Sequence, residues 1–374
     1  MKMWKFFREQ PINFMLIFVP LSIVAEVFKW EDGWIFLLSA LAIVPLARLI
    51  GESTEALTAY TGPRVGGLLN ATLGNAAELI ITIVAIREGL LELVKASITG
   101  SILGNILLVM GMSMLLGGLR NGLQRFNPRH AGRSAILLVL SVIALLIPSM
   151  LSSSIGAQGS FKVEMLSLGV AAIMIILYAA GLLFIYRLKD ESTSESIIPV
   201  DQGMLIQQTK RKAPVEKHAK TWSLRMALFV LALSTTGVAF LSELLVGTVE
   251  PVVKQLGVSE FFLGVILIPI IGNVAEHLVA VKAAIQDQME LSVEIAVASS
   301  LQVALFVAPV LVFLSLLMGN PLQLIFNQFE LLALIVAVLI TALVCQDGES
   351  NWLEGAELLA VYLILTLAFF LLPY

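Results

Sequence analysis

Two short and closely similar stretches each place a glutamate inside a long apolar run. The first, Gly74–Leu79, reads GNAAEL, and the second, Gly272–His277, reads GNVAEH. A carboxylate within an apolar segment of membrane length is energetically expensive and usually serves a function. Glu78 and Glu276 lie 198 residues apart in the chain. We therefore expect both side chains to meet in one polar site, to which two separate parts of the chain contribute.

The chemistry that this pair predicts is cation exchange. Two carboxylates with amide and backbone oxygens form a hard ligand set, which favours Ca²⁺, or another hard cation such as Mn²⁺ or Na⁺, over soft metals. When the metal leaves, two neighbouring carboxylates in a low-dielectric interior cannot both stay charged, so protons are the natural replacement. We interpret Glu78 and Glu276 as metal ligands and proton carriers. The structural alternative is that each only makes a helix-packing hydrogen bond.

We expect the helix to break just before each glutamate. Asn70 and Gly74 weaken the first helix, so Glu78 would lie in the first turn of a new half-helix, where free N–H groups and the helix dipole favour a carboxylate. In the second stretch Pro269 cannot donate a backbone hydrogen bond, and Gly272 follows it. Carbonyl groups released upstream of each break can point at a cation. Gly74 and Gly272 are therefore included in the predicted site.

Polar residues near each glutamate have both a functional and a structural interpretation. Asn75 and Asn273 are candidate ligands or, equally, caps of the two half-helices. His277 is a candidate proton acceptor or gate, or a histidine satisfied by a neighbouring backbone group. Small polar residues on the following helices are candidate ligands or ligand supports, although such residues also serve as packing contacts. They are Ser101 with Asn105, spaced i, i+4, and Ser299 with Gln302, spaced i, i+3.

Acids near the predicted helix ends are candidates for lining a path to the site. We select Glu55 and Glu243 for this role, and we interpret Glu243 as the deeper of the two. Simple solvation at the membrane interface explains Glu52 and Glu250 at least as well.

Composition identifies the chain as a helical membrane protein. Of its 374 residues, 58% are hydrophobic and 13% are charged, and the mean hydropathy is +0.94. Soluble domains usually carry about 25% charged residues. Apolar runs long enough for a helix to cross a bilayer recur along the whole chain. We predict an all-α fold of eleven transmembrane helices, at about 12–29, 34–57, 66–87, 92–118, 134–151, 164–187, 223–247, 260–285, 290–317, 329–345 and 353–373.

Basic residues set the predicted orientation. Four arginines lie between the fourth and fifth spans and six lysines and arginines between the sixth and seventh, whereas the loop Ser152–Ser160 has no charge. Lys and Arg accumulate on the cytoplasmic side of membranes. We expect both basic connections and the N-terminus, with Lys2, Lys5 and Arg8, to be cytoplasmic. The C-terminus would then lie on the opposite side of the membrane. We expect this membrane to be a prokaryotic plasma membrane.

The two halves of the chain repeat each other. Each half holds five predicted spans, and an odd number makes the second half enter the membrane from the opposite face, as in inverted-repeat transporters that bind substrate at the midplane. We divide the chain into an extra N-terminal helix (1–32), a first repeat (33–188), a cytoplasmic linker (189–222) and a second repeat (223–374). At the fixed offset of 198 residues, Gly66 matches Gly264, Gly74 and Asn75 match Gly272 and Asn273, Glu92 matches Glu290, and Ser101 matches Ser299.

Longer runs around both glutamates resemble a known family. The runs GGLLNATLGNAAELI, SITGSILGNILLVMGMSMLLGG, GNVAEH and ASSLQVALFVAPVLV are similar to the calcium/proton exchanger (CAX) family of the cation/calcium exchanger superfamily. The resemblance covers nearly the whole chain after the first span. It implies ten core helices in two inverted repeats plus an N-terminal helix, with Glu78 and Glu276 as the central ion and proton carriers.

The resemblance also implies a mechanism and the remaining parts of the site. Asn75, Asn273 and backbone carbonyls would complete the site, and His277 would belong to the second motif. Access would alternate by sliding of the second and seventh spans against a fixed bundle. Some family members carry a strongly acidic segment before the seventh span, whereas the linker here is mixed and ends basic. An acidic cation-sensing helix is therefore not expected in this chain.

The expected function is secondary antiport of Ca²⁺ against H⁺ within a lipid bilayer. The protein would not be an enzyme, and it would need no cofactor apart from the transported ions and no nucleic-acid partner. A Na⁺-driven exchanger of Ca²⁺ or another divalent cation is the alternative within this class. A passive channel is less favoured, because channels usually build rings from several subunits. A membrane metalloenzyme is also less favoured, because catalytic zinc takes three ligands rich in histidine and His130 and His218 fall in predicted loops.

Overall fold

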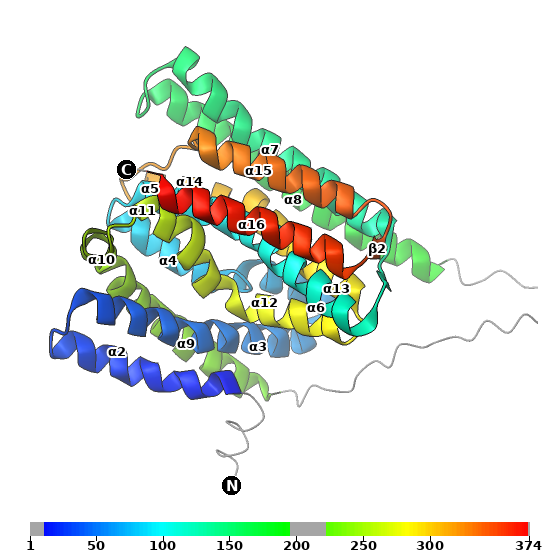
Figure 1. Cartoon of the computed structure of the whole chain (residues 1–374), viewed down its shortest axis with the longest axis horizontal. Helices are drawn as coiled ribbons and strands as arrows, with labels where there is room; N and C mark the ends of the chain where they lie inside the picture. Colours follow the sequence, from blue (N-terminus) through cyan, green and yellow to red (C-terminus); the bar gives the residue numbers. More distant parts are fainter. Residues whose placement is uncertain (1–10, 195–221, 373–374) are drawn as a thin grey trace, which may run out of the picture.

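The structure is a computed structural model of the chain, and it describes residues 11–194 and 222–372. Helices account for nearly all of the regular structure in this part of the chain (Figure 1). The predicted all-α class is therefore correct, apart from one pair of two-residue strands. These strands, β1 (Gln124–Arg125) and β2 (Glu349–Ser350), pair in antiparallel register and join two loops at one end of the bundle.

The helices follow one another closely along the chain. In order they are η1 (Pro11–Ile17), α2 (Phe18–Val27), α3 (Asp32–Leu73), α4 (Ala76–Arg87), α5 (Leu91–Leu103), η2 (Gly104–Val109), α6 (Met110–Asn121), α7 (Pro128–Ile155), α8 (Phe161–Ser194), α9 (Leu224–Gly247), α10 (Val249–Leu256), α11 (Glu260–Phe262), η3 (Leu263–Leu267), α12 (Ile268–Ile285), α13 (Met289–Gln302), η4 (Val303–Val307), α14 (Ala308–Leu317), α15 (Gln328–Val344) and α16 (Trp352–Leu371). The segments η2, η3 and η4 are π-helical turns inside longer helices. Such turns are frequent at functional sites.

Eight helices in the described residues are long and apolar enough to cross a membrane, so the protein is an integral membrane protein. Two further apolar helices are shorter, at Ile12–Val27 and Gln328–Val344. The predicted span at 66–87 is divided, because α3 ends at Leu73 and α4 begins at Ala76. The eight full-length helices cover residues 32–61, 91–121, 131–155, 161–184, 224–247, 260–285, 289–317 and 352–371.

The helix α3 is not straight. Eight residues along a straight α-helix span about 12 Å, whereas a Cβ placed on Gly66 would lie 2.8 Å from the Cβ of Thr58. The chain therefore doubles back between these residues, where the connection between the second and third predicted spans was expected. The helix continues through the polar residues before the reversal, and the hydroxyls of Ser53 and Thr54 are satisfied there by the carbonyl of Ile50.

The elements form a bundle with the broken and widened helices at its centre. Figure 1 shows α2, α3 and α9 together along one side and α7, α8 and α15 along the other, and helix contacts confirm both groups. Between them lie α4, α5, α12 and α13, which carry Glu78, Ser101, Glu276 and Ser299 respectively. Helix α5 is buried along its whole length from Leu93 to Leu103. The polar motifs are therefore buried within a core that is otherwise apolar.

Two glycines let the backbones of α5 and the η3–α12 helix touch. A Cβ placed on Gly100 would lie 2.0 Å from the carbonyl oxygen of Val265, and one on Gly264 would lie 3.0 Å from that of Leu93. No side chain fits in either place without movement of the backbone. Small residues at helix crossings permit this close approach in membranes. The crossing fixes the two helices that carry Ser101 and Glu276.

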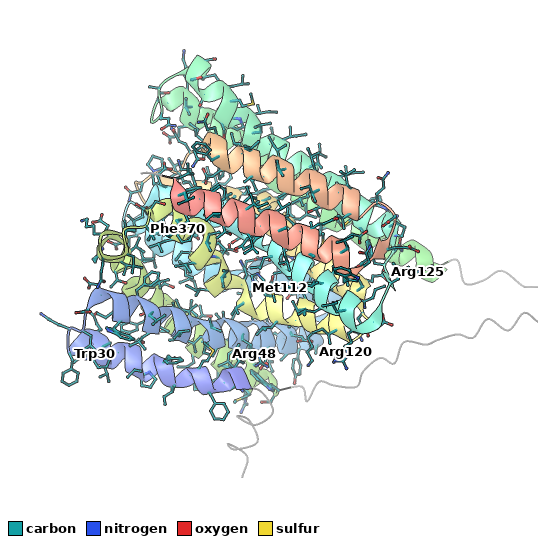
Figure 2. All side chains as sticks on the ribbon, viewed as in Figure 1. Trp30, Arg48, Met112, Arg120, Arg125 and Phe370 are labelled. Carbon is teal, nitrogen blue, oxygen red and sulfur yellow. The ribbon has the colours of Figure 1, made fainter. Side chains whose placement is uncertain are left out.

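The loops separate into two groups at opposite ends of the bundle. At one end, Gln124 donates to the carbonyl of Ala284 and to Asp287, close to the β1–β2 pair. At the other, Asn320 donates to the carbonyl of Ile86, and the amide of Gly159 donates to Gln323. Figure 2 shows Arg120 and Arg125 toward the first end and Trp30 at the second. The arginine-rich connection and the uncharged loop 152–160 are thus on opposite faces, as expected.

Two predicted segments fall largely outside the described residues. The helix α8 continues to Ser194, six residues into the predicted linker at 189–222, and residues 195–221 are not described. The basic N-terminal residues Lys2, Lys5 and Arg8 are likewise outside the described part of the chain.

Candidate ion-binding site

The predicted break before Glu78 is present. The helix α3 ends at Leu73, and α4 begins at Ala76 with Glu78 in its first turn. Asn75 occupies the N-cap position, but its side chain makes no capping hydrogen bond. Instead its amide donates to Oε1 of Gln302 on α13, at 2.7 Å. The capping interpretation of Asn75 is therefore wrong, and its side chain is directed to a distant helix of the other half.

The predicted break before Glu276 is absent, which corrects the sequence expectation. The helix α12 runs without interruption from Ile268 to Ile285, so Asn273 lies inside it and is not a cap. The reason lies one turn earlier. Pro269 sits in the first turn of α12, where a missing N–H is tolerated, and the π-helical turn Leu263–Leu267 precedes it. The irregular backbone associated with Pro269 therefore lies before it, in the π-helical turn, and α12 continues past Gly272.

The two glutamates meet across the contact between α4 and α12. A Cβ placed on Gly272 would lie 3.6 Å from the Cβ of Glu78, and one on Gly74 would lie 3.5 Å from Oε1 of Glu276. Glu78 is 2% exposed, and Glu276 is half-buried. Both acids therefore lie at the same contact between the two halves of the chain. Neither side chain stands alone in the hydrocarbon region.

Each glutamate is held by a serine from the next helix. The hydroxyl of Ser101 on α5 donates to Glu78, and the hydroxyl of Ser299 on α13 donates to Glu276. The amide of Asn273 then donates to Oγ of Ser101, at 3.2 Å. Ser101 and Asn273 thus connect the acid of the first half to the helix of the second. The structure brings the predicted serines to the acids rather than to packing contacts alone.

His277 contacts a side chain of the other half. Its Nε2 lies 3.2 Å from Oδ1 of Asn105, in the π-helical turn η2. The interpretation of His277 as a histidine satisfied only by backbone is therefore wrong. The contact joins His277 to another residue of the predicted site.

Two buried acceptor oxygens of the site lack a hydrogen-bond partner within the described residues. They are Oε2 of Glu78 and Oδ1 of Asn75, and Asn75 is only 1% exposed. Buried polar atoms are nearly always paired, so each unpaired atom calls for an explanation. Both atoms are hard oxygens of the kind that Ca²⁺ takes as ligands. The donor set therefore fits a hard cation as the missing partner.

The surroundings fit a soft or borderline metal less well. Among the residues that the structure describes, no group of three or more His, Cys, Asp and Glu side chains is placed to hold a metal ion. Catalytic zinc usually has three protein ligands. A cation bound between Glu78 and Glu276 would need amide, hydroxyl, backbone or water oxygens to complete its shell.

The acids selected for an access path lie away from this centre. Glu243 on α9 forms an ion pair with Arg87 at the end of α4, at 3.0 Å, and both side chains are about half exposed. That Glu243 is the deeper of the two candidates stays a prediction, since both side chains are exposed. Glu55 is exposed on α3. Glu52 is paired with Arg48 at 2.6 Å, and Glu250 lies 3.7 Å from Lys254.

Sequence reasoning missed two buried charges in the core, Lys95 and Glu330, which are 9% and 1% exposed. A lysine within the apolar run LVKASITG was the available signal for the first. Glu330 reads in sequence as an ordinary helix-capping residue after Asn327.

Comparison with known proteins adds an independent line of evidence. The family described as "Sodium/calcium exchanger protein" matches residues 32–187 and 226–371. The chain is 45% identical over 360 residues to a protein of Aphanothece halophytica named "Ca(2+)/H(+) antiporter", covering 96% of each chain. It is 42% identical to the "Ca(2+)/H(+) antiporter ChaA" of Bacillus subtilis, covering 95% of this chain and 97% of the other. Among solved structures, "Structure of native YfkE" superposes with a TM-score of 0.81 at 40% identity, covering 96% of this chain and 100% of that one.

Proposed function

Because this chain belongs to the sodium/calcium exchanger protein family, we propose that it exchanges Ca²⁺ for H⁺ across the membrane at the site formed by Glu78 and Glu276. The observation that carries the proposal is the meeting of these two acids in the core, with unpaired oxygens of Glu78 and Asn75 beside them. Relatives that match almost the whole chain are named as antiporters of these two ions. The protein acts as a transporter and not as an enzyme.

The exchange follows from the charge of the site. With Ca²⁺ bound, two carboxylates balance the charge of the metal. When Ca²⁺ leaves, each carboxylate takes a proton, because two unpaired charges in a low-dielectric core are costly. Ser101 and Ser299 hold the carboxyl groups in place in both states. The site is then close to neutral whichever load it carries, so it can change its exposure without leaving a bare charge in the membrane.

The proposed architecture is an N-terminal helix followed by two inverted repeats of five spans, with eleven crossings in all. Pairs of contacts at equivalent positions support the repeats, because Glu78 bonds Ser101 as Glu276 bonds Ser299. The glycines are related in the same way, because Gly74 lies against Glu276 and Gly272 lies against Glu78. The crossings beyond the eight long helices would be the two shorter apolar helices and the divided segment at 66–87. Access would alternate by movement of α3 and α9, which pack against each other at the side of the bundle.

The proposed orientation places the arginine-rich end of the bundle in the cytoplasm of a prokaryotic cell, with the protein in the plasma membrane. The positive-inside rule supports this assignment. The N-terminus would then be cytoplasmic and the C-terminus would lie on the opposite side.

Transport in proteoliposomes tests the proposal. Purified protein is reconstituted in liposomes with an acidic lumen, and uptake of radioactive Ca²⁺ from an alkaline medium is followed. We expect accumulation above the external concentration, which stops when a protonophore collapses the pH gradient. The same assay with choline in place of Na⁺ separates proton-driven from Na⁺-driven exchange. Absence of uptake at every imposed pH gradient contradicts the proposal, and flux that never runs uphill indicates a channel.

A further inference from the structure

A second pair of opposite charges is buried away from the two-glutamate site. Lys95 on α5 is 9% exposed and Glu330 on α15 is 1% exposed. Each takes part in a hydrogen bond between α5 and the chain at the start of α15: Lys95 donates to the carbonyl of Ile325, and Glu330 accepts from Thr99. Buried charges persist only where they are paired and hydrogen-bonded, since leaving one unpaired is strongly unfavourable. The hydrogen bonds of these two buried side chains therefore join α5 to the segment that leads into α15 and to α15 itself.

Lys95 connects α5 to the segment that leads into α15. Its Nζ donates to the carbonyl of Ile325, at 3.0 Å, and to Oε1 of Glu92, at 2.5 Å. Ile325 belongs to the non-helical stretch between α14 and α15. The ammonium group thus satisfies a backbone carbonyl far along the chain and a carboxylate that is largely exposed at 65%.

Glu330 connects the start of α15 to α5. Its Oε2 accepts the backbone N–H of Asn327 at 2.8 Å, which completes a capping box at the start of α15. Its Oε1 accepts the hydroxyl of Thr99 on α5, at 3.2 Å. A capping box needs only the first of these bonds. The second bond and the nearby Lys95 give this carboxylate a role in holding α5.

The contacts occupy one face of α5, and the ion site occupies another. Lys95 and Thr99 are spaced i, i+4, so they share a face. At about 100° per residue, Ser101 lies about 200° around the helix from Thr99. Ser101 is the residue that donates to Glu78 and accepts from Asn273. A rotation of α5 about its axis would therefore move Ser101 away from both partners.

We propose that Lys95 and Glu330 are positioning residues of the ion site. Together with Thr99 they set the rotation of α5, and so they hold Ser101 against Glu78 without touching the transported ion. This inference rests on the proposed exchange function. It assigns a part of the affinity for Ca²⁺ to residues on the opposite face of the helix.

The chain offers a matched control for the capping role alone. The helix α16 begins with the same arrangement, in which Oε2 of Glu354 accepts the N–H of Asn351 at 3.2 Å and completes a capping box. Glu354 is partly exposed, and among the described residues its hydrogen bonds are to Asn351 and not to α5. Replacing Glu354 therefore removes a capping carboxylate with no link to Ser101.

The test compares Glu330→Gln and Thr99→Val with Glu354→Gln and Thr99→Ser in the proteoliposome assay. Loss of a hydrogen bond to a charged group is worth about tenfold in an equilibrium constant. We expect Glu330→Gln and Thr99→Val to raise the Ca²⁺ concentration for half-maximal uptake about tenfold, with a smaller change in the maximal rate. Thr99→Ser and Glu354→Gln should stay within about twofold of the unsubstituted protein.

Thermal unfolding in detergent, measured for every variant, separates positioning from stability. The inference is overturned if Thr99→Val binds Ca²⁺ normally, or if Glu330→Gln and Glu354→Gln change half-saturation equally. Thr99→Val keeps the test decisive if Glu330→Gln does not fold, because it removes only a hydroxyl group. Failure of the unsubstituted protein to exchange Ca²⁺ for H⁺ would instead contradict the proposed function.

Discussion

Gly272 lies directly against Glu78: a Cβ placed on the glycine would be 3.6 Å from the Cβ of the acid. The equivalent contact in the other direction joins Gly74 to Glu276, with 3.5 Å from the placed Cβ to Oε1. Each half of the chain thus supplies a small residue opposite the acid of the other half. Because neither glycine has a side chain, the two helices can come close enough for the acids to share one site.

Replacing either acid by its amide should abolish exchange. We expect Glu78→Gln and Glu276→Gln each to eliminate Ca²⁺ uptake driven by a pH gradient, because glutamine carries neither the charge that binds the metal nor an exchangeable acid proton. The shape of the side chain is kept and no new charge is buried, so both variants should fold. Proteoliposome uptake and size-exclusion chromatography in detergent measure the two properties.

The control for this pair is Glu349→Gln on β2. Glu349 pairs with Arg125 at 3.1 Å, with side-chain exposures of 41% and 78%. Exposed ion pairs contribute little to the stability of a fold, so Ca²⁺ uptake by this variant should match that of the unsubstituted protein. Normal transport by either Glu78→Gln or Glu276→Gln would show that the ion binds elsewhere.

The two serines should differ in importance. Ser101 donates to Glu78 and accepts from Asn273, whereas within the described residues the hydroxyl of Ser299 bonds only Glu276. Ser101→Ala should therefore raise the Ca²⁺ concentration for half-maximal uptake more than Ser299→Ala. The expected change is about tenfold or more for the first, since a hydrogen bond to a charged group is worth about 1.5–3 kcal/mol. Equal effects of the two changes would contradict the bridging role of Ser101.

The crossing of α5 and α12 should not tolerate a methyl group. In Gly100→Ala the new Cβ would lie 2.0 Å from the carbonyl oxygen of Val265 and 2.6 Å from Cγ of Pro269. Overpacking of this kind costs about 1–3 kcal/mol and more where backbone must move. We expect a clear fall in the thermal unfolding temperature. Gly104→Ala is the control, because nothing lies within 4 Å of its Cβ position, and its unfolding temperature should be nearly unchanged.

The single cysteine offers a probe of folding. Cys345 follows the end of α15 and is fully buried. Burial first, and then the charges of Asp347 and Glu354, raise the pKa of its thiol to about 12. The thiol is therefore protonated at neutral pH, and protonated thiols react slowly. Maleimide labelling at pH 7.5 should be slow in the folded protein and fast after denaturation in SDS. Rapid labelling of the folded protein would show that Cys345 is not buried.

The sequence was sufficient to find the acids and their partners, because unusual residues stand out in apolar runs. Glu78 and Ser101 were both predicted from their types and spacing, and the structure places them in contact. The same reasoning failed for the helix around Asn273. The repeat suggests a helix break before each glutamate. In the second half, however, Pro269 lies in the first turn of α12, directly after the π-helical turn Leu263–Leu267, and the helix then continues through Asn273.

Long-range pairing limited the prediction elsewhere. Nothing local to Glu330 shows that Thr99, 231 residues earlier in the chain, bonds its carboxylate. Likewise nothing local to Glu243 shows that its side chain pairs with Arg87 at the end of α4. In both cases the missing information was which helices touch.

The backbone contact at Gly100 and Gly264 restricts how this protein can work. Because the two backbones are already in contact at these glycines, α5 and the η3–α12 helix cannot move closer together. We therefore expect the crossing to act as a fixed pivot in the middle of the molecule. A passage from either face to the acids must then be opened by the elements that surround the pivot. Chemical cross-links within the pivot should leave turnover intact, whereas a cross-link between α3 and the pivot helix α12 should arrest it.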